Sequence, residues 1–480
     1  MSTLHSRRDF LGAALAAGVL PMLPGALHAA SPVPKRLVAG TRVLEVSGRP
    51  AKVFGLIGPD GRSGIYVAPG DRFRVDLVNQ AGTPTIVHWH GQLPPWMQDG
   101  FPWPQTPPIA SGAVKAYDYV PTPGTYWMHS HHGLQEQSLM TAPLIVGDVA
   151  ELREDRQEIV LMLHDFTFRT PEEVLAGLTG TSASRMDMSG DAPGMLMPGM
   201  AMSEPGAMRM DLNDVQYDAF LANDRTLADP AIVRIERGGR VRLRVINGAS
   251  SSQFWIDIGG LVGRVVATDG HPVHPVPGSR FPIAMAQRLD ILIDLPKTGA
   301  FPILARLEGT GRQTGIVVAS PGARIPRIAE SAQAAPPVDN SLEVRLTGVE
   351  QLPPRSADVV RTITLDGSMK PYAWSMNGEY WPRVTPLMLG KGQRVEIDLV
   401  NRTMMSHPIH LHGHAFQVIA IDGRPIKGAV RDTVLVAPMT GRVRIAFDAD
   451  NPGRWAFHCH NLYHMATGML TEFRYEGISA

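Results

Sequence analysis

The sequence predicts an all-β protein made of three consecutive β-sandwich domains. Alternation of polar and apolar residues with a period of two is typical of a half-buried strand. Three ten-residue segments share such a pattern, each beginning with Gly and ending with Asn: 70–79, 238–247 and 392–401. Three copies of one strand at domain-sized spacing indicate three copies of one domain. The 48 Gly and 41 Pro residues also favour a turn-rich β protein.

The repeats set the domain boundaries. A chain of 480 residues has a prior of roughly three domains. We place domain one at residues 33–147, domain two at 156–321 and domain three at 342–480. The Pro-containing stretch 332–340 is expected to be a linker. Helical periodicity is weak, and residues 171–178 are the segment for which we expect one short helix.

Residues 1–30 resemble a twin-arginine export signal. Arg7 and Arg8 precede an apolar run at 11–23 that is too short, and too broken by Gly and Pro, to favour a membrane span. The alternative is a chance basic pair before a short core helix. The signal predicts a periplasmic protein. Lys+Arg and Asp+Glu both number 45, so the charge gives no reason to expect nucleic acid as a partner, and we expect a monomer.

Eight of the 17 histidines form four His-x-His pairs. Two pairs lie in domain one and two in domain three, at matching positions of the repeat, whereas domain two has no such pair. The pairs are His88/His90, His129/His131, His410/His412 and His458/His460. An isolated pair is more often part of a solvated strand or a structural zinc site. Four pairs at mirrored positions favour a cluster of three coppers between domains one and three, because imidazole suits copper.

Cys459 is the one cysteine of the chain, so no internal disulfide is expected. In a strand, Cys459 faces away from its neighbours His458 and His460, so one tripeptide can serve two metal sites. A trigonal site of two imidazoles and one thiolate with a weak axial Met is typical of blue copper. The candidates for the remaining ligands are His407, His464 and Met469.

These motifs resemble those of the multicopper oxidases, in the three-domain laccase-like group near the periplasmic copper-resistance branch. The resemblance implies cupredoxin-like Greek-key domains, four copper ions, and coupling of four one-electron oxidations to reduction of dioxygen to water, with electrons passing from Cys459 to His458 and His460. It implies a type 1 copper, a type 2 copper and two type 3 coppers held by the following residues. The type 1 copper would be bound by His407, Cys459, His464 and Met469, and the type 2 copper by His88 and His410. One type 3 copper would be bound by His90, His129 and His460, and the other by His131, His412 and His458.

The resemblance also places a carboxylate near the three-copper cluster at Asp99, where a proton relay is needed because oxygen reduction consumes protons. The alternative for Asp99 is a surface loop position beside Gly100. Some family members carry an acidic residue directly after the last type 1 histidine. Here that residue is Met465, so a second carboxylate is not expected at that place.

A Met-rich tract suggests the substrate. Its methionines are Met186, Met188, Met195, Met197, Met200, Met202, Met208 and Met210. Thioethers are soft ligands that select Cu(I), and Met405, two residues before His407, is a further candidate Cu(I) ligand. The position where cuprous oxidases carry an acidic residue holds Thr403. The tract is alternatively a flap or a plain linker.

We therefore expect an oxidase for Cu(I), for small phenols, or for both, that acts in copper tolerance. The alternative is a general laccase for phenols and aryl amines. A non-catalytic copper-binding or scaffold protein is a further alternative, but the full set of ligands and the Cys459 bridge argue against it.

Overall fold

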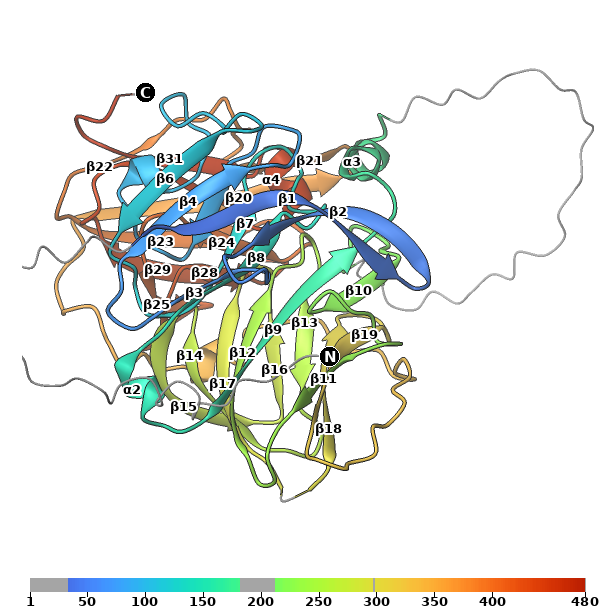
Figure 1. Ribbon diagram of the computed structural model, residues 1–480. Helices are drawn as coiled ribbons and strands as arrows, with labels where there is room; N and C mark the ends of the chain where they lie inside the picture. Colours follow the sequence, from blue (N-terminus) through green and yellow to red (C-terminus); the bar gives the residue numbers. More distant parts are fainter. Residues whose placement is uncertain (1–32, 182–211, 297, 480) are drawn as a thin grey trace, which may run out of the picture. The chain divides into compact units, whose positions relative to one another are not determined.

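The computed structural model describes residues 33–181, 212–296 and 298–479. The expected export signal and the eight methionines of the Met-rich tract, residues 186 to 210, lie outside the described residues. Strands dominate, and they form six sheets, two in each third of the chain (Figure 1). The predicted all-β class is confirmed.

Domain one contains two four-stranded sheets. In spatial order the first has β2 (Arg49–Ile57), β1 (Lys35–Val46), β4 (Phe73–Asn79) and β6 (Val114–Tyr119). The second has β3 (Ile65–Val67), β8 (Thr141–Val146), β7 (Gly124–Ser130) and β5 (Val87–His90).

Domain two contains a six-stranded and a five-stranded sheet. The first has β10 (Ala219–Ala222), β9 (Gln157–Phe166), β12 (Arg240–Asn247), β17 (Arg288–Asp294), β14 (Gly263–Thr268) and β15 (His271–Gly278). The second has β11 (Ala231–Arg234), β19 (Gln313–Ala319), β18 (Ala300–Leu307), β13 (Phe254–Asp257) and β16 (Arg280–Ile283).

Domain three contains a seven-stranded and a five-stranded sheet. The first has β21 (Tyr372–Met376), β20 (Val359–Met369), β23 (Arg394–Asn401), β29 (Arg442–Asp448), β25 (Phe416–Ile421) and β26 (Arg424–Pro425), with β27 (Val430–Arg431) paired to β25. The second has β22 (Leu387–Leu389), β31 (Leu470–Tyr475), β30 (Arg454–Cys459), β24 (His407–Leu411) and β28 (Thr433–Val436).

The three repeated segments occupy one topological position. β4, β12 and β23 each pair in parallel with the first long strand of their domain and antiparallel with a later strand on the other side. Burial alternates along β4, as the pattern predicts, whereas β12 and β23 are buried at most positions of both faces. The triplication inferred from the sequence is therefore present in the fold.

Helices are short and few in the described ranges. They are η1 (Trp96–Gln98), α2 (Val149–Leu152), α3 (Pro171–Thr179), η2 (Glu343–Arg345) and α4 (Leu462–Ala466). α3 is the helix expected at 171–178, and Thr170 with Glu173 forms a capping box at its start. No helix in the described part of the chain is long and apolar enough to span a membrane.

The two largest apolar cores support the sheets. One lies within domain one, around Phe73, Leu77 and Trp89. The other continues from domain two into domain three and includes residues such as Leu243 and Ile397. Strands of the first and last thirds of the chain, blue and orange to red in Figure 1, lie side by side, and their histidines meet there.

Candidate metal centres

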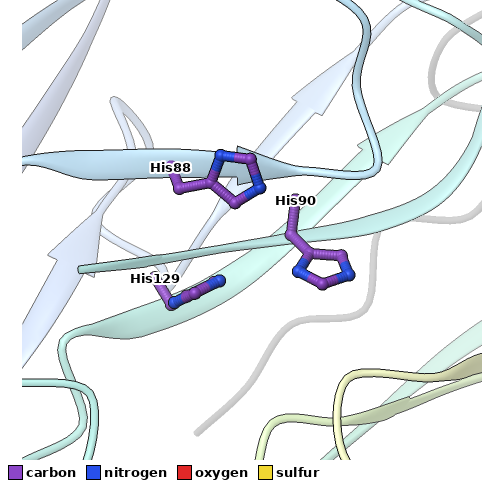
Figure 2. Close-up of side chains that lie close together, drawn as sticks. All are labelled: His88, His90 and His129. Atoms are coloured by element: carbon purple, nitrogen blue, oxygen red, sulfur yellow. The ribbon is translucent and has the colours of Figure 1, made fainter. Parts of the chain in front are cut away.

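Strand register brings the predicted ligands together. β5 pairs with β7 so that His88 lies opposite His129, and Figure 2 shows these side chains with His90. β24 pairs with β30 so that His410 lies opposite His458. Residues directly opposite on antiparallel strands share a face. The four His-x-His pairs therefore meet between domains one and three, and we call these eight residues the eight-histidine cluster.

The cluster is buried, with no member more than 8% exposed. Burial is the largest cause that lowers the pKa of these imidazoles, and neighbouring imidazoles add to it. The affected residues are His90, His129, His131, His410, His412, His458 and His460. Neutral imidazole is the form that binds a metal ion.

His88 and His410 face each other in a way that fits a cation. The Nδ1 of His88 lies 2.9 Å from the carbonyl oxygen of Asp99, and the Nδ1 of His410 lies 2.9 Å from that of Asp432. A carbonyl only accepts, so each Nδ1 carries the proton and each neutral ring has its lone pair on Nε2. The two Nε2 atoms are 3.3 Å apart. Two facing lone pairs repel unless a positive ion lies between or beside them.

His412 and His458 repeat this arrangement. The Nδ1 of His412 donates to Asp99 Oδ2 at 2.8 Å, and that of His458 donates to the carbonyl oxygen of Cys459 at 3.0 Å. Their Nε2 atoms are 3.1 Å apart. The Nε2 of His131 is buried with no hydrogen-bond partner among the described residues. His131, His412 and His458 bring one ligand atom each within 4.8 Å of one another.

Four further buried ring nitrogens of the cluster lack a hydrogen-bond partner in the described ranges: His90 Nδ1, both nitrogens of His129, and His460 Nε2. Their rings lie close, with centroids 5.0 to 5.6 Å apart. An unpaired buried nitrogen is costly, and a bound metal ion satisfies it. These three residues are the ones for which the family resemblance implies a shared type 3 copper, so the donor set fits copper.

The second group lies within domain three, and we call it the Cys459 site. The Nδ1 atoms of His407 and His464 are 3.1 Å apart and lie 3.6 and 3.7 Å from Cys459 Sγ. Met469 is fully buried, and its carbonyl oxygen accepts from the Cys459 N–H. Two imidazoles and one thiol with a neighbouring Met are the ligands of a blue copper site.

Local structure presents these ligands. His464 lies on α4, where the N-cap residue Asn461 accepts from the backbone N–H of His464. Burial raises the pKa of the Cys459 thiol and lowers that of His407. Metal binding at Cys459 must therefore displace the thiol proton, whereas His407 offers a free nitrogen lone pair.

Asp99 lies against the eight-histidine cluster and not in a surface loop. Its carboxylate is fully buried, 2.8 Å from His412 Nδ1 and 3.3 Å from His88 Nδ1. Gly100 follows with φ +89, and a Cβ there would lie 1.8 Å from the carbonyl oxygen of Val87. Gly at this position lets the Asp99 loop pack directly on β5.

The structure adds Asp432, which the sequence analysis did not identify. Its Oδ1 lies 2.9 Å from His90 Nε2 and 3.4 Å from His410 Nδ1. Arg288 of domain two pairs with the same carboxylate, at 2.5 Å. Burial opposes ionisation, but Arg288 and His90 hold the pKa of Asp432 well below its ordinary value. Asp432 lies at a bend between β27 and β28, and no local pattern in the sequence marks it.

Gly91 makes room for this pair. Its φ is +85, and a Cβ there would lie 2.4 Å from the Arg288 guanidinium and 2.6 Å from Asp432 Oδ2. Gly91 directly follows His90, so the chain after this ligand leaves space for the Arg288–Asp432 ion pair.

Glu136 and Asp214 were also missed. Glu136 Oε2 lies 2.7 Å from His129 Nδ1. Asp214 Oδ2 lies 2.9 Å from His464 Nε2 and accepts from Tyr372 and Asn461. Burial opposes its ionisation, but His464 and these donors lower the pKa of Asp214. In the sequence, Glu136 follows the His129/His131 motif by a few residues, which only weakly indicates a role at the site. No sequence feature indicates a role for Asp214.

A small cavity lies next to the Cys459 site. Its volume is about 20 Å³, and its lining includes Glu308, Met404, Met405 and Ser406. Met405 is buried, and Met404 is half exposed. Thr403 Oγ1 lies 2.8 Å from His407 Nε2. Thr403 therefore links this segment to a ligand of the Cys459 site.

Family models described as multicopper oxidase match residues 56–151, 157–321 and 354–477. The chain belongs to the multicopper oxidase family, whose members are copper-containing oxidoreductases that use dioxygen and reducing substrates.

Relatives carry different names within this family. The chain is 34% identical to the multicopper oxidase MmcO of Mycobacterium tuberculosis, covering 98% of this chain and 96% of that protein. It is 27% identical to a copper resistance protein A homolog of Pseudomonas syringae pv. tomato (99% and 100% covered). It is 28% identical to laccase-1 of Fomitopsis schrenkii (83% and 78% covered).

Solved structures support the fold. A laccase from Botrytis aclada superposes with a TM-score of 0.72 at 20% identity, covering 91% of this chain and 86% of that one. The expected cupredoxin-like architecture is confirmed.

Proposed function

We propose that this chain is a periplasmic, monomeric oxidase of the copper-resistance kind that oxidises Cu(I) at the Cys459 site and reduces dioxygen at the eight-histidine cluster. Four copper ions would be held, with His407, Cys459, His464 and Met469 as type 1 ligands and the cluster as type 2 and type 3 ligands in the arrangement set out above. When bound, copper supplies the redox chemistry, namely one-electron oxidation of the substrate and four-electron reduction of dioxygen to water.

The peptide around Cys459 supports coupling between the two sites. Cys459 belongs to the Cys459 site, and its neighbours His458 and His460 belong to the eight-histidine cluster. The main chain between them is a covalent connection for electrons. The backbone carbonyl of Cys459 also accepts from His458 Nδ1 at 3.0 Å, which fixes the orientation of that ring.

Asp99 supports the dioxygen half of the reaction. Its carboxylate contacts an imidazole of each facing pair, His88 and His412. A buried carboxylate at this place orients both rings and can pass protons towards the reacting oxygen, which four-electron reduction requires.

The observation that carries the choice of Cu(I) is the cavity beside Met405. Its lining includes Met404, Met405 and Glu308, and its volume of about 20 Å³ has room for a single ion or water. Thioethers select Cu(I). Met405 is two residues from His407, and Thr403 contacts His407 Nε2, so electrons released here have a short path to the Cys459 site. The Met-rich tract, residues 186 to 210, would add soft ligands for cuprous ion.

The second candidate is a laccase for phenols and aryl amines, favoured by the relative named laccase-1. Oxygen uptake by the copper-loaded protein, with Cu(I) and with a simple phenol side by side, separates the two.

Met405→Leu removes the sulfur at nearly constant volume. We expect the KM for Cu(I) to rise about tenfold or more, as a lost ligand worth ~1.4 kcal/mol requires, with phenol turnover unchanged. Deletion of residues 186 to 210 should act in the same direction. Met388→Leu, at a half-exposed Met on β22, is the matched control. Equal loss of both activities, or faster turnover of the phenol by the unaltered protein, would favour the laccase.

A further inference from the structure

Glu136 is a buried carboxylate for which the proposed function has no role so far. It lies in the turn between β7 and β8 and is 3% exposed. Its Oε2 is 2.7 Å from His129 Nδ1, and its Oε1 is 3.9 Å from His460 Nδ1. Both imidazoles have an Nε2 atom with no hydrogen-bond partner among the described residues. Glu136 thus directly contacts the outer nitrogen of His129, and the His460 ring lies next to that of His129, with centroids 5.0 Å apart.

The turn holds Glu136 rigidly. On one side, Gln135 donates to the carbonyl oxygen of Pro84 and accepts from Thr85. On the other side, the amide oxygen of Gln137 accepts from Tyr217 and Tyr463, residues of domains two and three. Both neighbours of Glu136 are therefore anchored. A carboxylate on an anchored turn can fix the rings that it touches.

Glu136 differs from the other carboxylates of the cluster in its partners. Asp432 has the Arg288 guanidinium as well as His90. The ion-pair contacts of Glu136 within the described residues are with histidines alone. Burying a carboxylate without a cation is costly, so packing alone gives no reason for an acid here. A positive ion on the far side of His129 and His460 gives one.

We propose that Glu136 is a positioning residue of the eight-histidine cluster, which holds the proton of His129 on Nδ1 and so keeps its Nε2 atom available for copper. This inference rests on the proposed function. A carboxylate oxygen can only accept, so its contact with His129 Nδ1 selects the ring form with a free Nε2. The Asp99 carboxylate does the same for His412, and the Asp99 carbonyl oxygen does so for His88.

Copper binding by the metal-free full chain tests this directly. Three variants are titrated with copper in competition with a chelator: Glu136→Leu, Glu136→Gln and Asp165→Asn. Glu136→Leu removes the acceptor, and Glu136→Gln keeps an amide oxygen in its place. Asp165 is an equally buried carboxylate that accepts from Ser250, Ser251 and Ser252. It is the matched control, because its hydrogen bonds go to serines.

We expect Glu136→Leu to bind the cluster copper about 10- to 100-fold more weakly, as for other lost partners of metal-bound histidines. The blue absorption of the Cys459 site should persist, Glu136→Gln should recover affinity relative to Glu136→Leu, and Asp165→Asn should bind copper like the unaltered protein. The proposal is overturned if Glu136→Leu keeps full affinity, if Glu136→Gln is no better than Glu136→Leu, or if Asp165→Asn causes the same loss. Failure of the unaltered protein to bind copper would instead reject the proposed function.

Discussion

The Cys459 site and the eight-histidine cluster differ in how many domains build them. The Cys459 site takes its four predicted ligands from β24, β30, α4 and the residue before β31, all in domain three. The cluster takes its imidazoles from domains one and three, and Arg288 of domain two pairs with the Asp432 carboxylate beside it. The ligands of one site come from a single sandwich and those of the other from two, while domain two supplies a partner to each, Asp214 at His464 and Arg288 at Asp432.

The two sites also balance charge differently. The cluster has Asp99, Asp432 and Glu136 on the outer nitrogens of its rings. At the Cys459 site, one outer nitrogen meets the Thr403 hydroxyl and the other meets Asp214. Three carboxylates around neutral imidazoles favour a strongly positive metal cluster, while the thiolate of Cys459 itself supplies charge to a single ion. The difference leads to three predictions.

The largest effect is expected from Cys459→Ser. The hydroxyl oxygen is a poor ligand for a blue copper site, so the variant should lose the blue absorption, bind about one copper fewer per chain and fall to background oxygen uptake. The eight-histidine cluster should still bind copper, because its ligands lie on other strands or on the opposite face of β30. Copper per chain and oxygen uptake, measured on one preparation, check this. Unchanged oxygen uptake would reject the enzyme proposal.

Arg288→Leu should destabilise the protein around the eight-histidine cluster by removing a buried ion pair. Removing the guanidinium leaves the buried Asp432 carboxylate without its cation, and breaking a buried pair in this way costs about 3–5 kcal/mol. The thermal midpoint of the metal-free protein should fall markedly. Arg72→Leu is the control, because its pair with Asp118 is exposed and should contribute little. Equal shifts for both variants would contradict an organising role for Arg288.

How far the sequence predicts these regions depends on the range of the contacts. Strand alternation and the His-x-His spacing identify the three sandwiches and the imidazoles, because both are properties of neighbouring residues. Asp99 came from family resemblance. Arg288, Asp432 and Asp214 act through partners more than a hundred residues away. No local pattern encodes such contacts, since they arise only when the domains pack.

The residues that line the cavity beside Met405 also lie far apart in the sequence. Met405 is apparent from its place before His407, but Glu308 belongs to the end of a domain two strand and joins Met404 and Met405 only in the folded chain. Thr403 occupies the position where cuprous oxidases carry an acidic residue, which argued against cuprous binding. Glu308 of domain two lines the same cavity as Met405, so this argument becomes weaker.

The smallest predicted effect concerns the protonation of the Glu308 carboxyl. Burial is the largest cause that raises the pKa of Glu308, from 4.5 to about 7, and its hydrogen bonds from the Val338 N–H and the Gln253 amide only partly offset it. Asp432, by contrast, has a pKa held well below its ordinary value. We therefore expect the buried acid beside the Cys459 site to titrate near neutrality and the one at the cluster to stay ionised.

The sign follows from linkage. The folded chain holds a proton on Glu308 that the unfolded chain releases above about pH 4.5, so this contribution to stability is full below that pH and is lost as the pH rises to about 7. Between about pH 5 and about pH 8 the loss should be on the order of 2–3 kcal/mol. Glu308→Gln cannot titrate, so the difference between its unfolding free energy and that of the unaltered protein should change by this amount across the range. Parallel curves would show that Glu308 is already ionised in the folded chain at neutral pH, as Asp432 is expected to be.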